Sequence, residues 1–420
     1  MSQRTKASVV ANRRDAVDVA RIRADFPILA REVYGRPLVY LDNAASAQKP
    51  AAVIEAMRAV MAGEYANVHR GDHYLSQRVT DRFEAARGKV ARYLNAANAD
   101  EIVFTRNATE AINLVAASYG RRFLGPGDEV VISHMEHHAN IVPWQLLRAE
   151  KGIVLKVIPI DDDGNLRMDA YRALLGPRTR LVAVAHASNV LGTINPVKEI
   201  ARLAHARGAL VLVDGAQGAV HGGADVRDLD VDFYALTGHK LYGPTGIGAL
   251  YGKKELLEKM PPYQGGGEMI SLVTFEETTF KHPPARFEAG TPAIVQAIGL
   301  GAAIDYVTAL GADTIAAQEQ ALLAYATERL SAVPGLAIQG RAAHKCSIVS
   351  FTIDGIHAHD IGTIVDRAGV AIRAGHHCAN PLMDRFDVPA TARASFAMYN
   401  TMAEVDSLIE ALHAVLEVFG

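Results

Sequence analysis

The chain is poor in cysteine: only two of its 420 residues, Cys346 and Cys378, carry a thiol. Two cysteines cannot build the disulfide framework of a small secreted domain, and they fit a reducing cytoplasm. Cys346 lies in an apolar strand pattern and is expected in the core, whereas Cys378 lies in a loop, so a disulfide between them is not expected. Cys378 directly follows His376 and His377, but three consecutive residues point in divergent directions and lack the spacing of metal ligands. The sequence therefore predicts no metal site.

The sequence also lacks a charge excess and a long apolar run. It has 43 lysines and arginines against 46 aspartates and glutamates, so charge gives no case for nucleic-acid binding. No apolar run is long enough to span a bilayer. Residues 1–14 are basic and contain no acidic residue, but no apolar signal core follows, so residues 1–18 are expected to be a disordered tail. The chain is therefore expected in the cytoplasm, away from membranes and nucleic acids.

Length and composition leave room for two domains. With 420 residues, of which 50% are hydrophobic, the chain can form a large domain and a smaller one. We expect residues 37–301 to form the large domain, residues 302–420 the small one, and residues 19–36 to pack on the small domain. In the small domain the patterns predict helices over 316–330 and 403–418 and strands over 347–353, 370–373 and 392–397.

Four short apolar runs in the middle of the chain read as strands, and each is followed by polar residues. The polar residues singled out at these four ends are His137, Asn189, Asp214 and Lys240. Apolar strands that alternate with amphipathic helices indicate an α/β fold with a mostly parallel sheet covered on both faces. Ligands bind such sheets beyond the carboxyl ends of the strands, so the four residues are predicted to share one crevice. Each alone is also explained as a turn, a cap or a structural residue.

One further element suggests an anion site. A strand over 101–105 leads into a helix that opens at Ala108, with Thr109 and Glu110 in its first turn. Free backbone amides at a helix start bind phosphate, although an ordinary helix cap explains the same residues.

The lysine is the most informative of these residues. Lys240 follows an apolar strand and stands beside His239 and close to Thr237. Desolvation lowers the pKa of an amine and lets it attack a carbonyl, although many lysines in loops are simply solvated. A lysine, a carboxylate at Asp214 and a phosphate site together fit pyridoxal phosphate, whose ring can stack on an imidazole such as that of His137.

A thiol and an arginine complete the candidate set. A loop with two histidines and an arginine favours the thiolate form of Cys378, and the alternative is an inert thiol. Arg393 lies in a strand pattern, where an unpaired charge is costly. Its planar fork suits either a substrate carboxylate or a structural salt bridge, and both interpretations stay open.

A set of motifs now resembles a known family, the SufS-type (group II) cysteine desulfurases. These are fold-type I, class V aminotransferase-like enzymes that use pyridoxal 5′-phosphate. The motifs are residues 41–46, 69–71, 136–140, 188–193, 214–217, 238–244 and 373–378, and the resemblance covers roughly residues 20 to 420. A short loop around Cys378 and the glycine-rich segment 263–270 favour group II, although a plain flexible turn also explains the glycines.

The resemblance implies a role for each candidate residue. Lys240 would hold the cofactor as a Schiff base, Cys378 would form the persulfide, and His137 would stack on the cofactor ring. The cofactor-binding residues would be Thr109, Asn189, Asp214, Gln217, Thr237, His239 and Lys240, with Thr291 from the second subunit of a homodimer. The substrate-binding residues would be Asn189, Arg373 and Arg393.

The implied activity is conversion of L-cysteine to L-alanine and an enzyme-bound persulfide for iron–sulfur cluster assembly. A sulfur-acceptor protein of the SufE or SufU type would receive the sulfur. A selenocysteine lyase or a cysteine sulfinate desulfinase would need the same lysine and arginine, so both remain alternatives. A non-catalytic sulfur-relay scaffold is disfavoured because Lys240 and Cys378 are both present.

Overall fold

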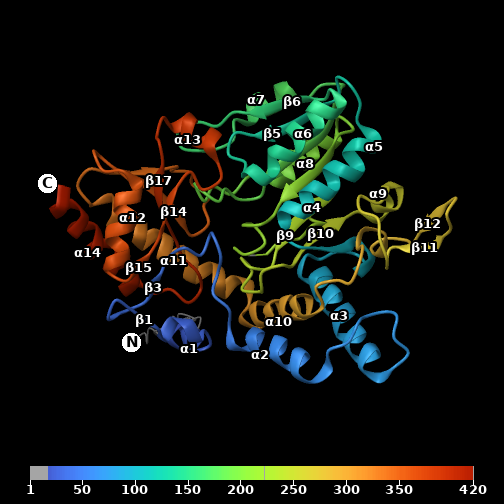
Figure 1. Cartoon of the computed structure of the whole chain (residues 1–420). Helices are drawn as coiled ribbons and strands as arrows, with labels where there is room; N and C mark the ends of the chain where they lie inside the picture. The colour runs from blue at the N-terminus through green and yellow to red at the C-terminus, as the bar shows by residue number, and fades with distance from the viewer. Residues whose placement is uncertain (1–17, 222, 420) are drawn as a thin grey trace, which may run out of the picture.

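The computed structural model describes residues 18–221 and 223–419, so almost all of the predicted tail lies outside the described residues. Two α/β units lie side by side, the larger one formed by the middle of the chain and the smaller one by its C-terminal part (Figure 1). The large unit is built on a seven-stranded sheet in the order β4-β10-β9-β8-β7-β5-β6. Its strands are β4 (Ile102–Thr105), β5 (Glu129–Ser133), β6 (Val154–Ile158), β7 (Thr179–Ala185), β8 (Leu210–Asp214), β9 (Phe233–Thr237) and β10 (Gly248–Gly252).

The large sheet is parallel except at β10, which runs antiparallel to both of its neighbours. The predicted α/β fold with a mostly parallel sheet is confirmed. Apart from the edge strand β6, the strands are buried on both faces, which explains why they appear as continuous apolar runs in the sequence. Because successive strand residues point to opposite faces, each strand contributes to two separate apolar clusters.

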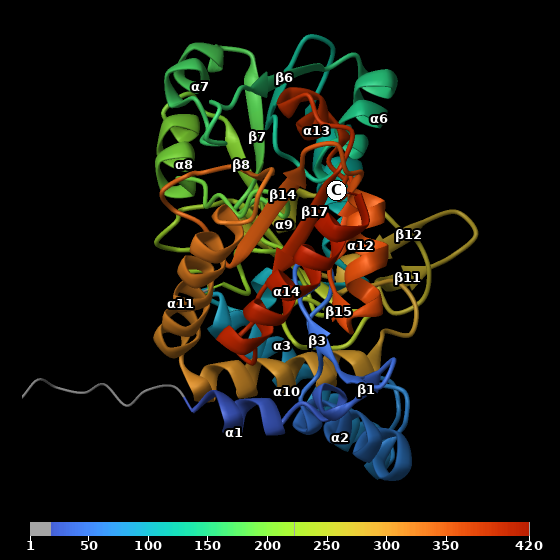
Figure 2. The same ribbon diagram turned by 90° about the vertical axis from the view of Figure 1, so that its left-hand side faces the viewer.

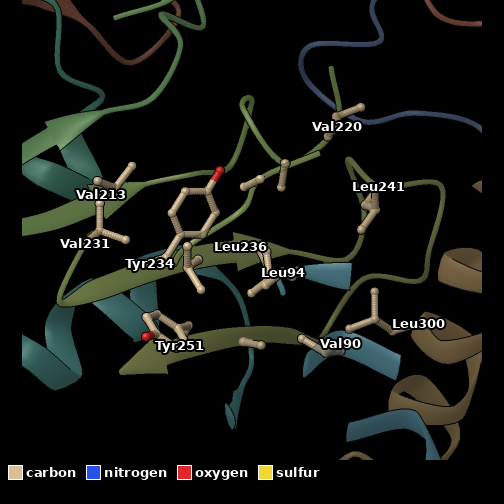
Figure 3. Packing of buried hydrophobic residues seen from close by; sticks show 14 of the residues in the cluster. Val90, Leu94, Val213, Val220, Val231, Tyr234, Leu236, Leu241, Tyr251 and Leu300 are labelled. Carbon is tan, nitrogen blue, oxygen red and sulfur yellow. The ribbon is translucent and has the colours of Figure 1, made fainter. Parts of the chain in front are cut away.

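Helices cover both faces of this sheet. One cluster joins it to α3 (Tyr74–Tyr93), α7 (Met168–Leu174), α8 (Val197–His205) and α10 (Ile294–Leu310). The other cluster joins it to α4 (Ala108–Val115), α6 (Val142–Lys151) and α9 (Lys254–Lys259). In the first cluster, Val213 of β8 lies beside Val231, and Val90 of α3 lies beside Leu300 of α10 (Figure 3).

The C-terminal unit is a four-stranded antiparallel sheet with helices packed on it. The strand order is β13 (Leu336–Gln339), β14 (Ile348–Ile353), β17 (Thr391–Ser395) and β16 (Arg373–Gly375). The helices are α11 (Ala312–Ser331), α12 (Ala358–Arg367), α13 (Asn380–Phe386) and α14 (Met402–Phe419). The two predicted helices correspond to α11 and α14, although α11 begins four residues earlier than expected, at Ala312. The predicted domain boundary after residue 301 falls inside the continuous helix α10.

The single strand predicted over 370–373 is wrong, because the chain divides there between two sheets. β15 (Val370–Ala371) pairs in parallel with β3 (Val39–Tyr40), whereas β16 pairs with β17. The sequence pattern could not show this, because the partner strand β3 lies about 330 residues earlier.

The N-terminal segment contacts both units. It contains α1 (Val19–Ala24), β1 (Glu32–Val33) and β2 (Arg36–Pro37), and α2 (Ala51–Ala59) follows β3. Arg23 pairs with Glu404 of α14 at 2.8 Å, and the Tyr34 hydroxyl donates to Asp366 of α12 at 3.1 Å. On the other side, Asp25 accepts the hydroxyl of Tyr306 on α10 at 2.8 Å.

Two further findings are a hairpin that projects at the surface and the limited length and apolarity of the single helices. The hairpin β11 (Ile270–Val273) and β12 (Thr278–Phe280) projects from the large unit after the glycine-rich segment (Figure 2). Within residues 18–221 and 223–419, no single helix has the length and apolarity to cross a membrane, and α10 with α11 passes only as a pair bent by 79°.

Candidate active site

A cavity of about 260 Å³ opens at the carboxyl edge of the large sheet, where the two units meet. It brings together all the predicted site residues except Thr291. These residues are Thr109, His137, Asn189, Asp214, Gln217, Thr237, His239, Lys240, Arg373, Cys378 and Arg393. The large sheet supplies the first eight, because β4, β5, β7, β8 and β9 all end at this edge. The C-terminal unit supplies the two arginines and the thiol.

One end of the cavity is suited to an anion. The side chain of Asn107 caps α4 by accepting the amide of Glu110 at 2.9 Å. The amides of Ala108 and Thr109 have no acceptor in the part of the chain that the structure describes, so they remain able to bind a ligand at the positive end of the helix. The buried Thr237 hydroxyl likewise lacks a hydrogen-bond partner among the described residues. Because an unpaired buried hydroxyl is costly, this geometry fits a bound phosphate.

The middle of the cavity holds the lysine, the carboxylate and the imidazole. Burial lowers the pKa of the Lys240 amine to about 8, although the charge of Asp214 opposes the shift. A neutral, nucleophilic amine is therefore accessible near neutral pH. Burial also lowers the pKa of His137 to about 4, and the charge on Lys240 adds to that shift. His137 is consequently neutral, as suits a stacking ring, and its Nδ1 accepts the Ala139 amide at 3.0 Å.

The loop that carries Cys378 is held against the large unit. His377 and Cys378 both adopt left-handed backbone conformations, with φ of 52° and 57°, which are strained for residues other than glycine. The amide of His138 donates to the Cys378 carbonyl, and the Asn189 side chain donates to the His377 carbonyl, each at 2.8 Å. These bonds present the exposed Cys378 thiol to the cavity. Cys346, by contrast, is buried as predicted, and burial raises the pKa of its thiol to about 12.

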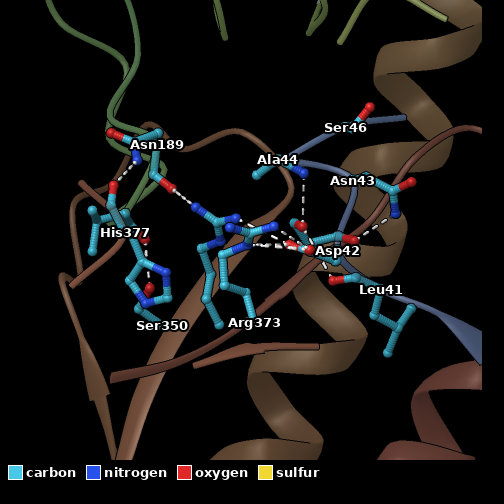
Figure 4. Close-up of polar contacts among 12 residues, drawn as sticks. Leu41, Asp42, Asn43, Ala44, Ser46, Asn189, Ser350, Arg373 and His377 are labelled. Atoms are coloured by element: carbon cyan, nitrogen blue, oxygen red, sulfur yellow. Dashed lines mark hydrogen bonds and ion pairs between the residues drawn. The ribbon is translucent and has the colours of Figure 1, made fainter. Parts of the chain in front are cut away.

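Both cavity arginines contact one carboxylate that the sequence did not single out, that of Asp42. Figure 4 shows Arg373 against this carboxylate. Arg373 donates through Nε and Nη2 at 3.0–3.2 Å, and Arg393 donates through Nη2 at 3.1 Å. The structure therefore contains a salt bridge of Arg393, one of the two interpretations that the sequence left open. Its Nε is nevertheless buried without a partner in the described chain, so the guanidinium keeps a donor for a ligand.

A second residue absent from the predicted set, Glu136, supports the loop that carries His137. Its carboxylate accepts the Asn140 side chain at 2.7 Å and the Ala185 amide at 3.1 Å, which ties the end of β5 to that of β7. Asn140 in turn accepts the indole N–H of Trp144 at 3.0 Å. Burial raises the pKa of Glu136 to about 7.

Two further predictions concern Thr291 and metals. Thr291 lies outside the cavity, in a separate hollow that is also lined by Arg106, Glu110 and Tyr263. This position does not conflict with the expectation that Thr291 reaches the site of a second subunit. In the ranges 18–221 and 223–419, no cluster of three or more His, Cys, Asp or Glu side chains could hold a metal ion.

Glycine at position 215 is required for the position of Asp214. A Cβ atom there would collide with the ring of Tyr234, which is fully buried and whose hydroxyl lies 2.9 Å from His186 Nδ1. We expect Gly215→Ala to lower the free energy of unfolding by about 1–3 kcal/mol and to weaken binding of the predicted cofactor, because the Asp214 backbone must move. Urea unfolding can be followed by emission from Trp144, the only tryptophan. Gly63→Ala, where a Cβ meets nothing within 4 Å, is the matched control. Equal stability and cofactor affinity in both variants would contradict this prediction.

Comparison with known proteins gives matches over nearly the whole chain. The family model described as Aminotransferase class-V matches residues 39–408. A cysteine desulfurase of Dickeya dadantii (strain 3937) is 56% identical over 403 residues, which cover 96% of this chain and 98% of that protein. The solved cysteine desulfurase CsdA (S-sulfonic acid) of Escherichia coli is 43% identical with a TM-score of 0.89, covering 96% of this chain and 100% of that one. A C-DES mutant with glycine covalently linked to its PLP cofactor is 25% identical with a TM-score of 0.80, covering 93% and 98%.

Proposed function

This chain belongs to the class-V aminotransferase family, and from that premise we propose that it is a pyridoxal-phosphate-dependent cysteine desulfurase. It converts L-cysteine to L-alanine and retains the sulfur as a persulfide. The observation that carries the proposal is that a lysine amine of lowered pKa and an accessible thiol, Lys240 and Cys378, line the same cavity.

The cavity fits the cofactor at each of its functional groups. Pyridoxal 5′-phosphate supplies an aldehyde for a lysine and a ring that takes up electrons from the substrate. The phosphate would be held by Thr237, His239 and the free amides at the start of α4, including that of Thr109. Asp214 would face the ring nitrogen, Gln217 the phenolic oxygen and His137 the ring face. Asn189 would complete the cofactor site.

The chemistry that the protein contributes is binding, proton transfer and sulfur transfer. Arg393 would bind the substrate carboxylate with its free Nε donor, assisted by Asn189 and Arg373. The Lys240 amine would accept the α-proton, because its lowered pKa makes the neutral form far more accessible near neutral pH than in an ordinary lysine. The Cys378 thiolate would then attack the substrate sulfur, so that an S–S bond forms as the substrate C–S bond breaks.

The proposal also includes two protein partners, a sulfur acceptor and a second copy of this chain. The exposure of Cys378 allows a second protein to reach a persulfide there. We therefore include a sulfur-acceptor protein of the SufE or SufU type, in the cytoplasm, as the route to iron–sulfur clusters. We also include a homodimer in which Thr291 of one subunit completes the phosphate site of the other.

The decisive experiment measures products from L-cysteine with the holoenzyme. Without a reductant we expect alanine in an amount stoichiometric with the enzyme, because a persulfide on Cys378 stops further turnover. With a thiol reductant we expect continuous release of alanine and sulfide. No alanine under either condition would contradict the function. Faster turnover of selenocysteine or cysteine sulfinate would instead assign the enzyme to one of the two alternatives.

A further inference from the structure

Lys49 is a partly buried lysine that lies next to the cavity without lining it. It stands between β3 and α2, just before that helix. Its Nζ donates to the carbonyl of His239 at 3.1 Å and also to the carbonyl of Ala47. Within residues 18–221 and 223–419 this amine forms no ion pair, and burial lowers the pKa of Lys49 to about 8. The amine is therefore mainly charged at neutral pH, and a charge without a counter-ion is costly away from water.

The contact with His239 brings this charge to the phosphate end of the cavity. The carbonyl of His239 accepts three donors from one segment, the Ala47 amide at 3.1 Å, the Ser46 hydroxyl at 3.2 Å and the Lys49 amine. These bonds hold the segment against the turn that precedes Lys240. Because the His239 side chain lines the cavity, a single residue separates the Lys49 charge from the place where a phosphate would bind.

The donors at the phosphate end are neutral. They are the free amides at the start of α4, the Thr237 hydroxyl and the imidazole of His239. Burial lowers the pKa of His239 to about 4, and the charges on Lys240 and Lys49 add to that shift, so the imidazole carries no charge at neutral pH. A bound phosphate, by contrast, carries about two negative charges near neutral pH.

The other charged groups close to this end are already paired or are used elsewhere. Arg106 and Glu110 form an ion pair at 3.2 Å at the start of α4. Lys240 would be occupied by the cofactor aldehyde, and Asp214 would face the ring nitrogen. The two arginines and the thiol from the C-terminal unit would serve the substrate. Among the described residues beside the phosphate end, Lys49 is therefore the cation that still lacks a negative partner.

We propose that Lys49 supplies the positive charge that balances the phosphate of the cofactor, acting from behind His239 and without touching the reacting atoms. The inference rests on the proposed function and deepens it. The phosphate and the Lys49 amine stabilise each other, because each would otherwise be a charge held partly out of water without a counter-charge. Such an interaction is stronger than one between two surface charges at the same separation.

The test compares pyridoxal 5′-phosphate with pyridoxal, which has the same aldehyde and ring but no phosphate. The dissociation constant of each compound is measured at neutral pH by absorbance titration of the full-length protein freed of cofactor, and the ratio of the two constants is the readout. Lys49→Gln keeps a donor for the His239 carbonyl but removes the charge. It should weaken binding of pyridoxal 5′-phosphate about tenfold and leave binding of pyridoxal nearly unchanged. Lys49→Arg retains the charge and should retain the wild-type ratio.

Ser46→Ala is the matched control. It removes a hydrogen bond to the same His239 carbonyl without changing any charge, so the ratio should stay at the wild-type value. If Lys49 only holds this turn in place, Lys49→Gln will weaken both compounds equally, and that result overturns the proposal. An unchanged ratio also overturns it. If Lys49→Gln does not fold, Lys49→Met, which keeps the apolar stem, decides by the same ratio.

The wild-type protein separates this inference from the proposed function. A wild type that binds pyridoxal 5′-phosphate no more tightly than pyridoxal would contradict the phosphate site, and with it the proposed function. A wild type that prefers pyridoxal 5′-phosphate, together with an unchanged preference in Lys49→Gln, would overturn only the role of Lys49.

Discussion

Lys240→Ala is expected to lower kcat/KM for alanine release from L-cysteine by about 10³-fold or more. The substitution removes the only lysine amine among the residues that line the described cavity, and with it both the cofactor attachment and the proton acceptor. Borohydride reduction should fix the cofactor to the wild-type chain at position 240 and to no residue of the variant. Peptide mass mapping after reduction is the measurement.

Lys345→Ala is the matched control for this substitution. Burial also lowers the pKa of the Lys345 amine to about 8, but that amine donates to Gly340 O at 2.7 Å and lies outside the cavity. The control should retain most of the activity, because a lowered pKa without an aldehyde in reach has no catalytic use. Trapping of the cofactor on another lysine in Lys240→Ala would contradict the assignment.

The pKa of Lys240 also predicts how fast the cofactor is taken up. Only the neutral amine attacks an aldehyde, and the pKa of Lys240 is about 8. Loading of cofactor into the apoprotein should therefore accelerate as the pH rises through about 8 and level off above it.

Local sequence patterns were sufficient to predict the position of site residues that stand at the end of a single strand. Asp214 and Lys240 each follow an apolar run, and parallel packing places such ends at one edge regardless of how far apart they lie in sequence. The same reasoning predicted the α/β fold. It did not identify β10, and the antiparallel direction of that strand could not have been predicted, because a short apolar run has the same pattern in either direction.

Features that depend on distant partners could not be predicted in this way. Asp42 lies more than 330 residues from Arg373 and Arg393 in sequence, and the pairing of β3 with β15 and the bridge between Asp42 and Ser395 bring it to them. Glu136 lies in a recognised motif, yet its role depends on the Ala185 amide of another strand. In both cases the missing information was a long-range backbone pairing, which residue types and spacing do not record.

Cys378→Ala is expected to separate cofactor binding from sulfur transfer. The variant retains Lys240, so it should still bind the cofactor, yet alanine release from L-cysteine should fall by about 10²-fold or more because no thiolate attacks the substrate sulfur. Mass spectrometry of the intact chain after incubation with L-cysteine should detect an added sulfur atom in the wild type and none in the variant. Alanine is a better replacement than glycine here, because glycine would release the left-handed backbone strain at φ 57° and change the loop as well.

Cys346→Ala provides the matched control for the second thiol. Burial holds the pKa of the Cys346 thiol at about 12, and its Sγ donates to Gly192 O at 3.2 Å, so this thiol is protonated and occupied at neutral pH. The control should therefore release alanine at nearly the wild-type rate and still gain sulfur at Cys378. A persulfide on Cys346, or sulfur release by Cys378→Ala at the wild-type rate, would show that the sulfur leaves the substrate by another route. The expected difference in reactivity between Cys378 and Cys346 depends on their environments alone, since both residues carry a thiol. Only Cys378 lies on the strained loop that gives it access to the cavity.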